Sequence, residues 1–307
     1  MPAWSRLTRW LRLGRPRQWS KNVLVLLPVI FAQKAGDVSA WAYALAATAA
    51  FCLASSAVYA FNDIRDRHAD RLHPRKKDRP IAAGAVGVPQ AYAFSLVTTL
   101  AALGLSAWLH PLAAGLIGAY LALQLVYSLS LKRRMIADVI CIALGFVLRT
   151  VTGAVVIEAP PSPWLIVCTF TLCLFLGFCK RRAELATMGN RPDAQTYRRT
   201  LAGYDPELLT HLITLSAGIA IVSFLLYAVS DETEARFGTV YLAYTLPLVV
   251  YAICRFAMLS MWGRYDDPAE LILRDRAFQA AAALWLAAVL AIIYWGPYIR
   301  DWIGRTW

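Results

Sequence analysis

The sequence AWAYALAATAAFCLASSAVYAF, residues 40–61, decides the fold, because it contains 22 residues and no charge. A helix needs on the order of 20 apolar residues to cross the hydrocarbon core of a bilayer. Residues 40–61 therefore predict a membrane-spanning helix. The apolar run ends directly at the polar sequence NDIRDRHAD, residues 62–70, so the helix would deliver an acidic segment to the membrane surface.

Apolar segments of the same kind recur along the chain. Hydrophobic residues make up 59% of the 307 residues and charged residues only 16%, whereas soluble domains contain roughly 25% charged residues. This composition excludes a water-soluble fold with one core and predicts an all-α polytopic membrane protein. The nine predicted spans are 22–34, 40–61, 89–109, 111–131, 135–157, 163–179, 207–229, 238–260 and 277–298.

The segment 1–21 has a different pattern. On a helical wheel one arc is apolar and the opposite arc is basic. The apolar residues are Trp4, Leu7, Trp10 and Leu11, and the basic residues are Arg6, Arg9 and Arg12. This pattern predicts an amphipathic helix in the membrane interface, followed by a single transmembrane domain over 22–307. An ordinary basic flank of the first span is the alternative.

The basic residues indicate the orientation of the spans. Of the 31 Lys and Arg residues, 26 lie in five segments that the nine spans place on one side of the membrane. The segments are 1–21, 62–88, 132–134, 180–206 and 255–276. The positive-inside rule then predicts a cytosolic N-terminus and an external C-terminus. The expected location is the inner (plasma) membrane of the cell. The net charge of +12 is explained by this topology and by attraction to anionic lipid or phosphate, so no nucleic acid is expected.

The acidic segment 62–70 carries the residues most suited to chemistry. If the helix continues, Asn62, Asp66, Asp70 and Asp63 lie at about 0°, 40°, 80° and 100° on the wheel. Three crowded carboxylates repel each other unless a cation binds among them. An oxygen-lined site near phosphate favours Mg²⁺. The alternative is a solvated loop whose aspartates pair with nearby arginines, namely Arg65, Arg67, Arg71 and Arg75.

These residues resemble the UbiA-type superfamily of intramembrane prenyltransferases. The resemblance rests on Asn62-Asp63-x-x-Asp66-x-x-x-Asp70, Arg79-Pro80, Gly84 and Tyr127-x-x-x-x-Lys132. It implies nine helices around a lateral cavity that opens to lipid and is capped by cytosolic loops. It also implies that the acidic motif holds Mg²⁺ and a diphosphate.

One departure from the superfamily pattern narrows the expected function. A second acidic motif, Asp-x-x-x-Asp, should follow the sixth span, but the chain has Lys180-Arg181-Arg182-Ala183-Glu184 there. Cations at this place suit an anion that brings no metal of its own. With the blocks 15–22 and 273–276, this exchange resembles the decaprenyl-phosphate phosphoribosyltransferase branch. That branch moves 5-phosphoribose from phosphoribosyl diphosphate to a polyprenyl phosphate, a step toward lipid-linked arabinose for cell-envelope glycans.

The resemblance implies a role for each group of site residues. Asp63, Asp66 and Asp70 are expected to hold Mg²⁺ and to be the catalytic carboxylates. The expected substrate-binding residues are Asn62, Lys21, Arg79, Tyr127, Lys132, Lys180, Arg181, Arg182 and Glu184. For Lys21, a basic flank of the first span is the alternative. No general base is required, because the acceptor phosphate is already an anion at neutral pH.

Two charged residues fall inside the fifth span. Asp138 lies near its cytosolic start, and Arg149 lies about 16 Å deeper at helical rise. A charge within a span suggests a functional role by default, so both are candidate substrate-binding residues. A structural ion pair is the alternative for Arg149. Asp205-Pro206 and Asp267-Pro268 predict helix N-caps followed by proline at the first helical position.

Two other functions are compatible with parts of the sequence. A transferase that joins a prenyl diphosphate to an aromatic acceptor would need the missing second aspartate pair. A transporter or lipid-binding scaffold would favour charges spread through the spans and an internal repeat, and no convincing repeat is present. The six cysteines lie in or beside apolar segments and predict no metal site or disulfide. Self-association into a homo-oligomer stays open.

Overall fold

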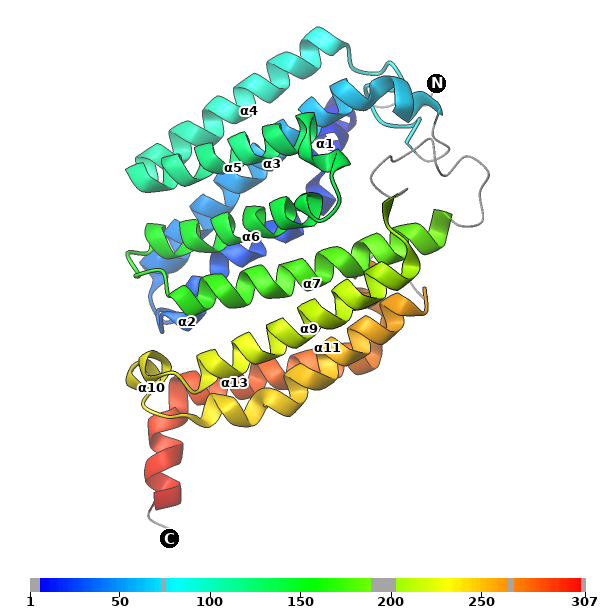
Figure 1. The fold of residues 1–307 in the computed structure, drawn as a ribbon. Helices are drawn as coiled ribbons and strands as arrows, with labels where there is room; N and C mark the ends of the chain where they lie inside the picture. The colour runs from blue at the N-terminus through cyan, green and yellow to red at the C-terminus, as the bar shows by residue number, and fades with distance from the viewer. Residues whose placement is uncertain (1–5, 73–75, 189–202, 264–267, 305–307) are drawn as a thin grey trace. The chain divides into compact units, whose positions relative to one another are not determined.

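The computed structural model describes residues 6–72, 76–188, 203–263 and 268–304. Within these ranges the chain forms α-helices and short 3-10 helices and no strand (Figure 1). The elements are α1 Arg6–Gly14, η1 Pro16–Leu26, α2 Leu27–Phe31, α3 Val38–Leu72, α4 Val88–Leu109, α5 Pro111–Leu129, η2 Leu131–Arg133, α6 Ala137–Val156, α7 Pro163–Met188, α9 Pro206–Ala228, α10 Asp231–Phe237, η4 Tyr241–Thr245, α11 Leu246–Met261, α12 Pro268–Arg274 and α13 Arg276–Gly304.

The expected all-α polytopic class is confirmed. In the described ranges, 8 helical segments are long and apolar enough to cross a membrane, and they match eight of the nine predicted spans. The remaining span, 22–34, is not one continuous helix but the end of η1 followed by α2. Pro28 is the physical reason, because it has no N–H for a continuous helical ladder and sits at the start of α2.

Packing contacts divide the chain into two units. Unit 1 is Met1–Lys132 with Gly145–Pro161, and unit 2 is Arg133–Leu144 with Ser162–Trp307, so α6 contributes residues to both. The division predicted from the sequence, into a segment 1–21 and one domain 22–307, is of a different kind and stays a prediction.

Unit 1 is built around α3, which packs against α4, α5, α1 and η1. The buried face of α3 consists largely of alanine, and small side chains allow membrane helices to approach closely. Its buried alanines include Ala40, Ala44, Ala47, Ala50 and Ala54. At α1, Leu11 is 50% exposed whereas Leu13 is fully buried, so this helix both packs on the unit and presents an apolar surface.

A glycine on α6 allows η1 to pack closely in unit 1. A Cβ atom at Gly153 would lie 2.0 Å from the carbonyl oxygen of Val25, which no real side chain tolerates. The short helical segment at the first predicted span therefore packs with its backbone directly on α6.

Unit 2 contains α7, which packs against α9 and α11, and α13, which packs against α11. Aromatic rings pack edge to face in this core. Phe256 contacts Phe175 and Phe278 at ring-centroid distances of 5.7 and 5.6 Å. Asp205 caps α9 as predicted, because its carboxylate accepts hydrogen bonds from the backbone N–H groups of Glu207 and Leu208. The other predicted cap residue, Asp267, lies outside the described residues.

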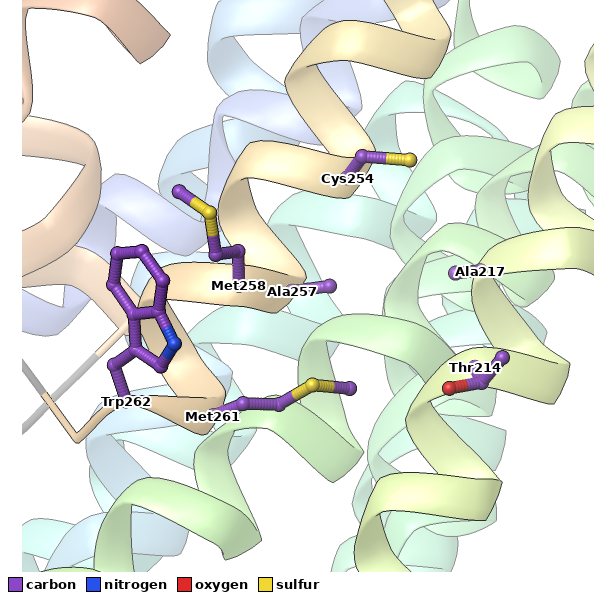
Figure 2. A pocket seen from close by; sticks show the side chains of 7 residues that line it. All are labelled: Thr214, Ala217, Cys254, Ala257, Met258, Met261 and Trp262. Atoms are coloured by element: carbon purple, nitrogen blue, oxygen red, sulfur yellow. The ribbon is translucent and has the colours of Figure 1, made fainter.

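An open pocket of about 360 Å³ lies between α9 and α11 of unit 2 (Figure 2). Its lining is mainly apolar and consists of Thr214, Ala217, Cys254, Ala257, Met258, Met261 and Trp262. It contains none of the residues that the sequence singled out for chemistry, so the candidate site has to be sought at the acidic motif and its partners.

Candidate functional site

The acidic motif lies on the continuation of α3. This helix has 35 residues and is therefore about 52 Å long, whereas the hydrocarbon core of a bilayer is about 30 Å thick. The apolar part is long enough to fill the membrane, and the C-terminal turns would then carry the motif beyond it. The expectation that the helix continues through Asp70 is confirmed.

On one side of α3, two buried carboxylates pair with two guanidinium groups, one of which contacts both. Asp63 is 1% exposed and Asp70 is 4% exposed. Arg79 donates from Nη1 to Asp63 Oδ1 at 3.0 Å and to Asp70 Oδ2 at 2.7 Å. Arg15 also donates to Asp63 Oδ1, and its guanidinium lies 5.1 Å from the ring centroid of Tyr59. Both carboxylates are therefore neutralised by arginines that lie outside the motif.

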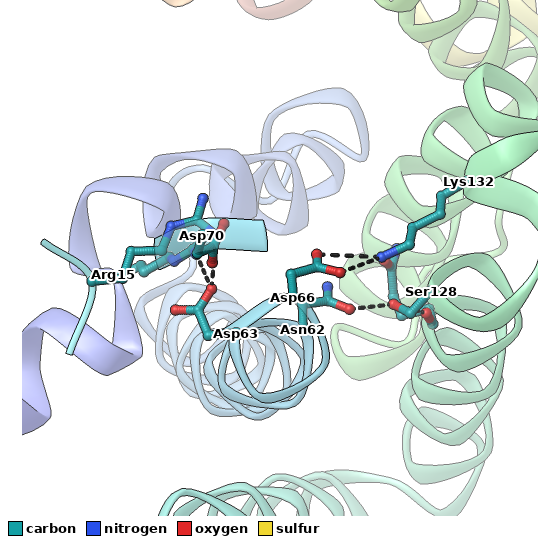
Figure 3. Close-up of polar contacts among 9 residues, drawn as sticks. Arg15, Asn62, Asp63, Asp66, Asp70, Ser128 and Lys132 are labelled. Atoms are coloured by element: carbon teal, nitrogen blue, oxygen red, sulfur yellow. Dashed lines mark hydrogen bonds and ion pairs between the residues drawn. The ribbon is translucent and has the colours of Figure 1, made fainter. Parts of the chain in front are cut away.

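On the other side of α3, Asn62 and Asp66 face the end of α5 and η2. Lys132 Nζ lies 2.9 Å from Asp66 Oδ1, and the hydroxyl of Ser128 donates to Asn62 Oδ1. Asp66 has a side chain 42% exposed, so it is the most open of the three carboxylates. Figure 3 shows this separation, with Asp63 directed toward Arg15 and Asp66 toward Lys132.

The three aspartates therefore do not form a single cluster. Within the described residues, no group of three or more His, Cys, Asp or Glu side chains is arranged to hold a metal ion. The physical reason is that cations on different elements attract the carboxylates to two edges of the predicted arc. The alternative of a solvated loop does not describe Asp63 either, because its carboxylate is buried.

The carboxylate pair nevertheless fits a hard divalent cation that arrives with phosphate. Mg²⁺ in phosphate-binding sites commonly takes one or two carboxylates and completes its shell with water and substrate oxygens. Asp63 Oδ2 is buried and has no hydrogen-bond partner among the described residues, so its lone pairs remain available. Asp63 and Asp70 would then be the primary ligands, and Asp66 lies on the neighbouring edge of the same helix.

A second polar cluster lies in unit 2 around Asp138. Arg181 Nε lies 2.8 Å from Asp138 Oδ2, and Arg181 also pairs with Glu184. The hydroxyl of Tyr204 donates to Asp138 Oδ1 at 3.1 Å and accepts a hydrogen bond from the backbone N–H of Ile136. Burial raises the pKa of Tyr204 to about 12, so its hydroxyl remains a donor at neutral pH. The cluster joins the start of α6 to α7 and to the segment before α9.

The three consecutive cations of α7 have different surroundings. Arg181 is 3% exposed and is neutralised by two carboxylates, so its contacts are those of an internal ion pair. Lys180 and Arg182 are half-buried, and Arg182 Nε is buried without a hydrogen-bond partner in the described part of the chain. Of the three, Lys180 and Arg182 are therefore the ones that pair with no carboxylate in the described ranges and can bind an anion.

Arg149 lies in unit 1 with neutral partners. It is 5% exposed and donates hydrogen bonds to Asn22 Oδ1 at 2.7 Å, to the Gly145 carbonyl at 2.7 Å and to the Tyr120 hydroxyl at 3.0 Å. The aromatic rings of Phe51, Tyr120 and Phe146 surround the guanidinium at 4.6–5.4 Å. Arg149 therefore forms no ion pair among the described residues. The structural ion pair that the sequence left open as an alternative for Arg149 is not found in this part of the chain.

The remaining predicted residues lie at the edges of these clusters. Tyr127 is half-buried on α5 beside Ser128, and Lys21 is exposed on η1. Arg75, one of the arginines expected to pair with the motif, lies outside the described residues. Arg67 instead donates from Nε to Nε2 of His68, and Arg71 donates to the carbonyl of Ala82.

Several polar residues of these clusters are not among the residues predicted from the sequence, including Asn22 and Tyr120 beside Arg149. Arg15 belongs to the block 15–22 that supports the resemblance, but no individual binding role is predicted for it from the sequence. Ser128 is one helical turn before Lys132, so the spacing could have placed both on the same face. For Tyr204 we find no sequence signal that would have paired it with Asp138.

Comparison with known proteins identifies the family. The model of the UbiA prenyltransferase family matches residues 22–278. A decaprenyl-phosphate phosphoribosyltransferase from Mycolicibacterium smegmatis is 35% identical over 295 residues, which cover 92% of each chain. A second protein of this name, from Corynebacterium glutamicum, is 33% identical and covers 92% of this chain and 86% of its own.

The fold agrees with a solved structure of the same family. A UbiA homologue from Archaeoglobus fulgidus bound to GPP and Mg²⁺ aligns with a TM-score of 0.68 at 20% sequence identity. The alignment covers 93% of this chain and 99% of that chain, so the fold is shared over most of both chains. This chain belongs to the UbiA prenyltransferase family.

Proposed function

We propose that this chain transfers 5-phosphoribose from phosphoribosyl diphosphate to a polyprenyl phosphate of the decaprenyl type and releases diphosphate. The observation that carries the proposal is the 35% identity, over 92% of both chains, to a relative named decaprenyl-phosphate phosphoribosyltransferase. The composition of the polar clusters supports it, because one carries carboxylates for a metal diphosphate, and beside the other lie two cations, Lys180 and Arg182, with no carboxylate partner among the described residues.

The unit 1 site is assigned to the leaving diphosphate. Asp63, Asp66 and Asp70 would hold Mg²⁺, directly or through water, and the bound ion would neutralise charge that develops on the diphosphate. Arg79 and Lys132 can turn from their carboxylates to diphosphate oxygens, because each already lies at the edge of the site. Asn62 orients the group from α3.

Four further residues have assigned substrate roles. Tyr127 is the neighbouring hydroxyl on α5, and Lys21 provides an exposed cation on η1. Lys180 and Arg182 are assigned to a phosphate that carries no metal, either the 5-phosphate of the donor or the phosphate of the acceptor lipid. A guanidinium and an ammonium that pair with no carboxylate in the described ranges suit a phosphate monoester.

Arg181, Glu184, Asp138 and Arg149 are assigned positioning roles rather than direct contact with substrate. The first three form the buried cluster of unit 2, and Arg149 connects η1, α5 and α6 through neutral acceptors. Their substitution should act first on stability.

The bond changes require little proton transfer. The bond between ribose C1 and the diphosphate oxygen breaks, and an oxygen of the acceptor phosphate forms the new bond to C1. The transition state should resemble an oxocarbenium ion, so leaving-group neutralisation and alignment provide most of the acceleration. The acceptor is already an anion, which agrees with the exposed position of His68, the motif's one histidine.

We also propose that the chain is a plasma-membrane protein with its acidic motif on the cytosolic side. The distribution of 26 of 31 basic residues supports this orientation. Soluble phosphoribosyl diphosphate and Mg²⁺ would reach the motif from the cytosol, and the acceptor would arrive from the bilayer. The expected setting is synthesis of a lipid-linked arabinose donor for cell-envelope glycans.

A transfer assay tests the proposal. Purified protein in detergent receives phosphoribosyl diphosphate labelled in the ribose, Mg²⁺ and decaprenyl phosphate, and the lipid phase is extracted. We expect labelled lipid that requires all three components. Absence of labelled lipid, with prenylation of an aromatic acid when a prenyl diphosphate is supplied instead, would contradict the proposal and favour an aromatic prenyltransferase.

A further inference from the structure

Arg15 is held in an unusual backbone conformation. Its φ and ψ angles are 52° and 61°, in the left-handed region that residues other than glycine seldom adopt. It also precedes Pro16, and a residue before proline normally adopts an extended conformation. Non-glycine residues persist in such conformations where the surroundings over-determine them, and these positions cluster at functional sites. This geometry places the Arg15 side chain against Asp63.

The ion-paired side chains of the acidic motif balance in charge within the part of the chain that the structure describes. Asp63 contacts Arg15 and Arg79, Asp70 contacts Arg79, and Asp66 contacts Lys132. Three carboxylates and three cations give a formal charge of zero for these six side chains. A divalent cation entering alone would add two uncompensated charges close to two guanidinium groups, and this repulsion opposes its binding.

A diphosphate changes that balance. It brings several negative charges, which can both compensate the metal and accept hydrogen bonds from the displaced guanidinium groups. Arg15 is well suited to such an exchange, because its side chain is 25% exposed while its partner Asp63 is 1% exposed. The buried Asp63 Oδ2 lacks a partner among the described residues and is ready to receive a cation.

We propose that Arg15 is a diphosphate-binding residue that pairs with the Asp63 carboxylate until the metal diphosphate binds. Binding of the metal ion then depends on the diphosphate. Arg15 moves from the Asp63 carboxylate to a diphosphate oxygen, and no covalent bond changes. The inference rests on the proposed function for the identity of the donor, but its binding step requires only a diphosphate. It predicts that the metal and the diphosphate bind together rather than the metal first.

Mn²⁺ binding followed by electron paramagnetic resonance tests this inference on the full chain in detergent, with inorganic diphosphate as the second ligand. For Arg15→Gln we expect Mn²⁺ alone to bind roughly tenfold more tightly, because one repelling charge has been removed. We expect diphosphate, in the presence of Mn²⁺, to bind roughly tenfold more weakly, because one charge-assisted contact has been lost. A merely structural role for Arg15 would not move the two affinities in opposite directions.

Arg17→Gln is the matched control, since Arg17 is an exposed arginine on η1 and both affinities should equal those of the wild type. Arg15→Lys keeps the charge and provides a second test should Arg15→Gln fail to fold. It should bind Mn²⁺ alone like the wild type and diphosphate more weakly. Unchanged affinities in both Arg15 variants, or weaker Mn²⁺ binding in Arg15→Gln, would overturn the inference.

The outcome can be separated from that of the proposed function. The binding experiment contains no ribose donor and no lipid acceptor, so it reports on the carboxylate site alone. Opposite shifts in Arg15→Gln, together with no phosphoribosyl transfer by the wild-type protein, would support the inference and contradict the proposed function. Normal transfer by the wild-type protein, with no opposite shifts of the two affinities in Arg15→Gln, would support the proposed function and contradict the inference.

Discussion

At the scale of single residues, charge compensation separates cations that look alike in the sequence. Lys180, Arg181 and Arg182 are consecutive, and the sequence assigned all three to phosphate. Arg181 is buried and paired with Asp138 and Glu184, whereas the structure gives Lys180 no such partner among the described residues. The difference arises because only one of three successive helical residues can point to the core of unit 2.

A pair of neighbouring substitutions tests this separation. Arg181→Gln leaves Asp138 buried without its counter-charge, and breaking a buried pair in this way costs about 3–5 kcal/mol. We expect a clear fall in the thermal unfolding temperature in detergent. Lys180→Gln should leave stability within about 0.5 kcal/mol of the wild type and should raise the KM for a phosphate substrate. Equal unfolding temperatures for the two variants would contradict the assigned roles.

The acidic motif shows what residue patterns predict and what they omit. The spacing of Asn62, Asp63, Asp66 and Asp70 correctly predicted a helical arc, because α3 continues through the motif. It did not predict the division of that arc into two edges. This division depends on Arg15, Arg79 and Lys132, which reach α3 from separate elements, and a helical wheel contains no information about such long-range partners.

At the scale of elements, the length of the apolar segments predicted the positions of the spans well. It predicted less well whether each span is one continuous helix. Eight spans appear as long helices in the described ranges, since some 20 apolar residues have few other ways to satisfy their backbone groups in lipid. The segment 22–34 has too few residues for a full crossing and contains Pro28, so it forms η1 and α2. Its close packing on Gly153 follows from a contact that sequence patterns do not specify.

Gly153 permits a test of that close packing. Gly153→Ala places a methyl group on the Val25 carbonyl, and overpacking of this kind costs about 1–3 kcal/mol. Gly118→Ala is the control, because nothing lies within 4 Å of a Cβ atom at Gly118 on α5. Alanine should be neutral there or stabilise the helix by up to about 1 kcal/mol. Unfolding in detergent gives both values, and a stable Gly153→Ala variant would disprove the close approach of η1.

At the scale of the whole molecule, composition established the membrane class and the motifs established the family. Both predictions are confirmed by the long apolar helices, the family match over residues 22–278 and the TM-score of 0.68 with a solved homologue. The roles of individual side chains stay predictions, because they depend on bound substrates. The central claim is that ribose, rather than a prenyl group, is transferred away from the diphosphate.

A double-label measurement tests that claim most directly. Phosphoribosyl diphosphate is labelled with ¹⁴C in the ribose and with ³²P at the terminal phosphate of its diphosphate group. It is incubated with the protein, Mg²⁺ and decaprenyl phosphate. We predict that ¹⁴C enters the lipid phase while ³²P leaves as free diphosphate, one for one. Retention of both labels in the aqueous donor, or transfer of both labels together into lipid, would contradict the assigned reaction.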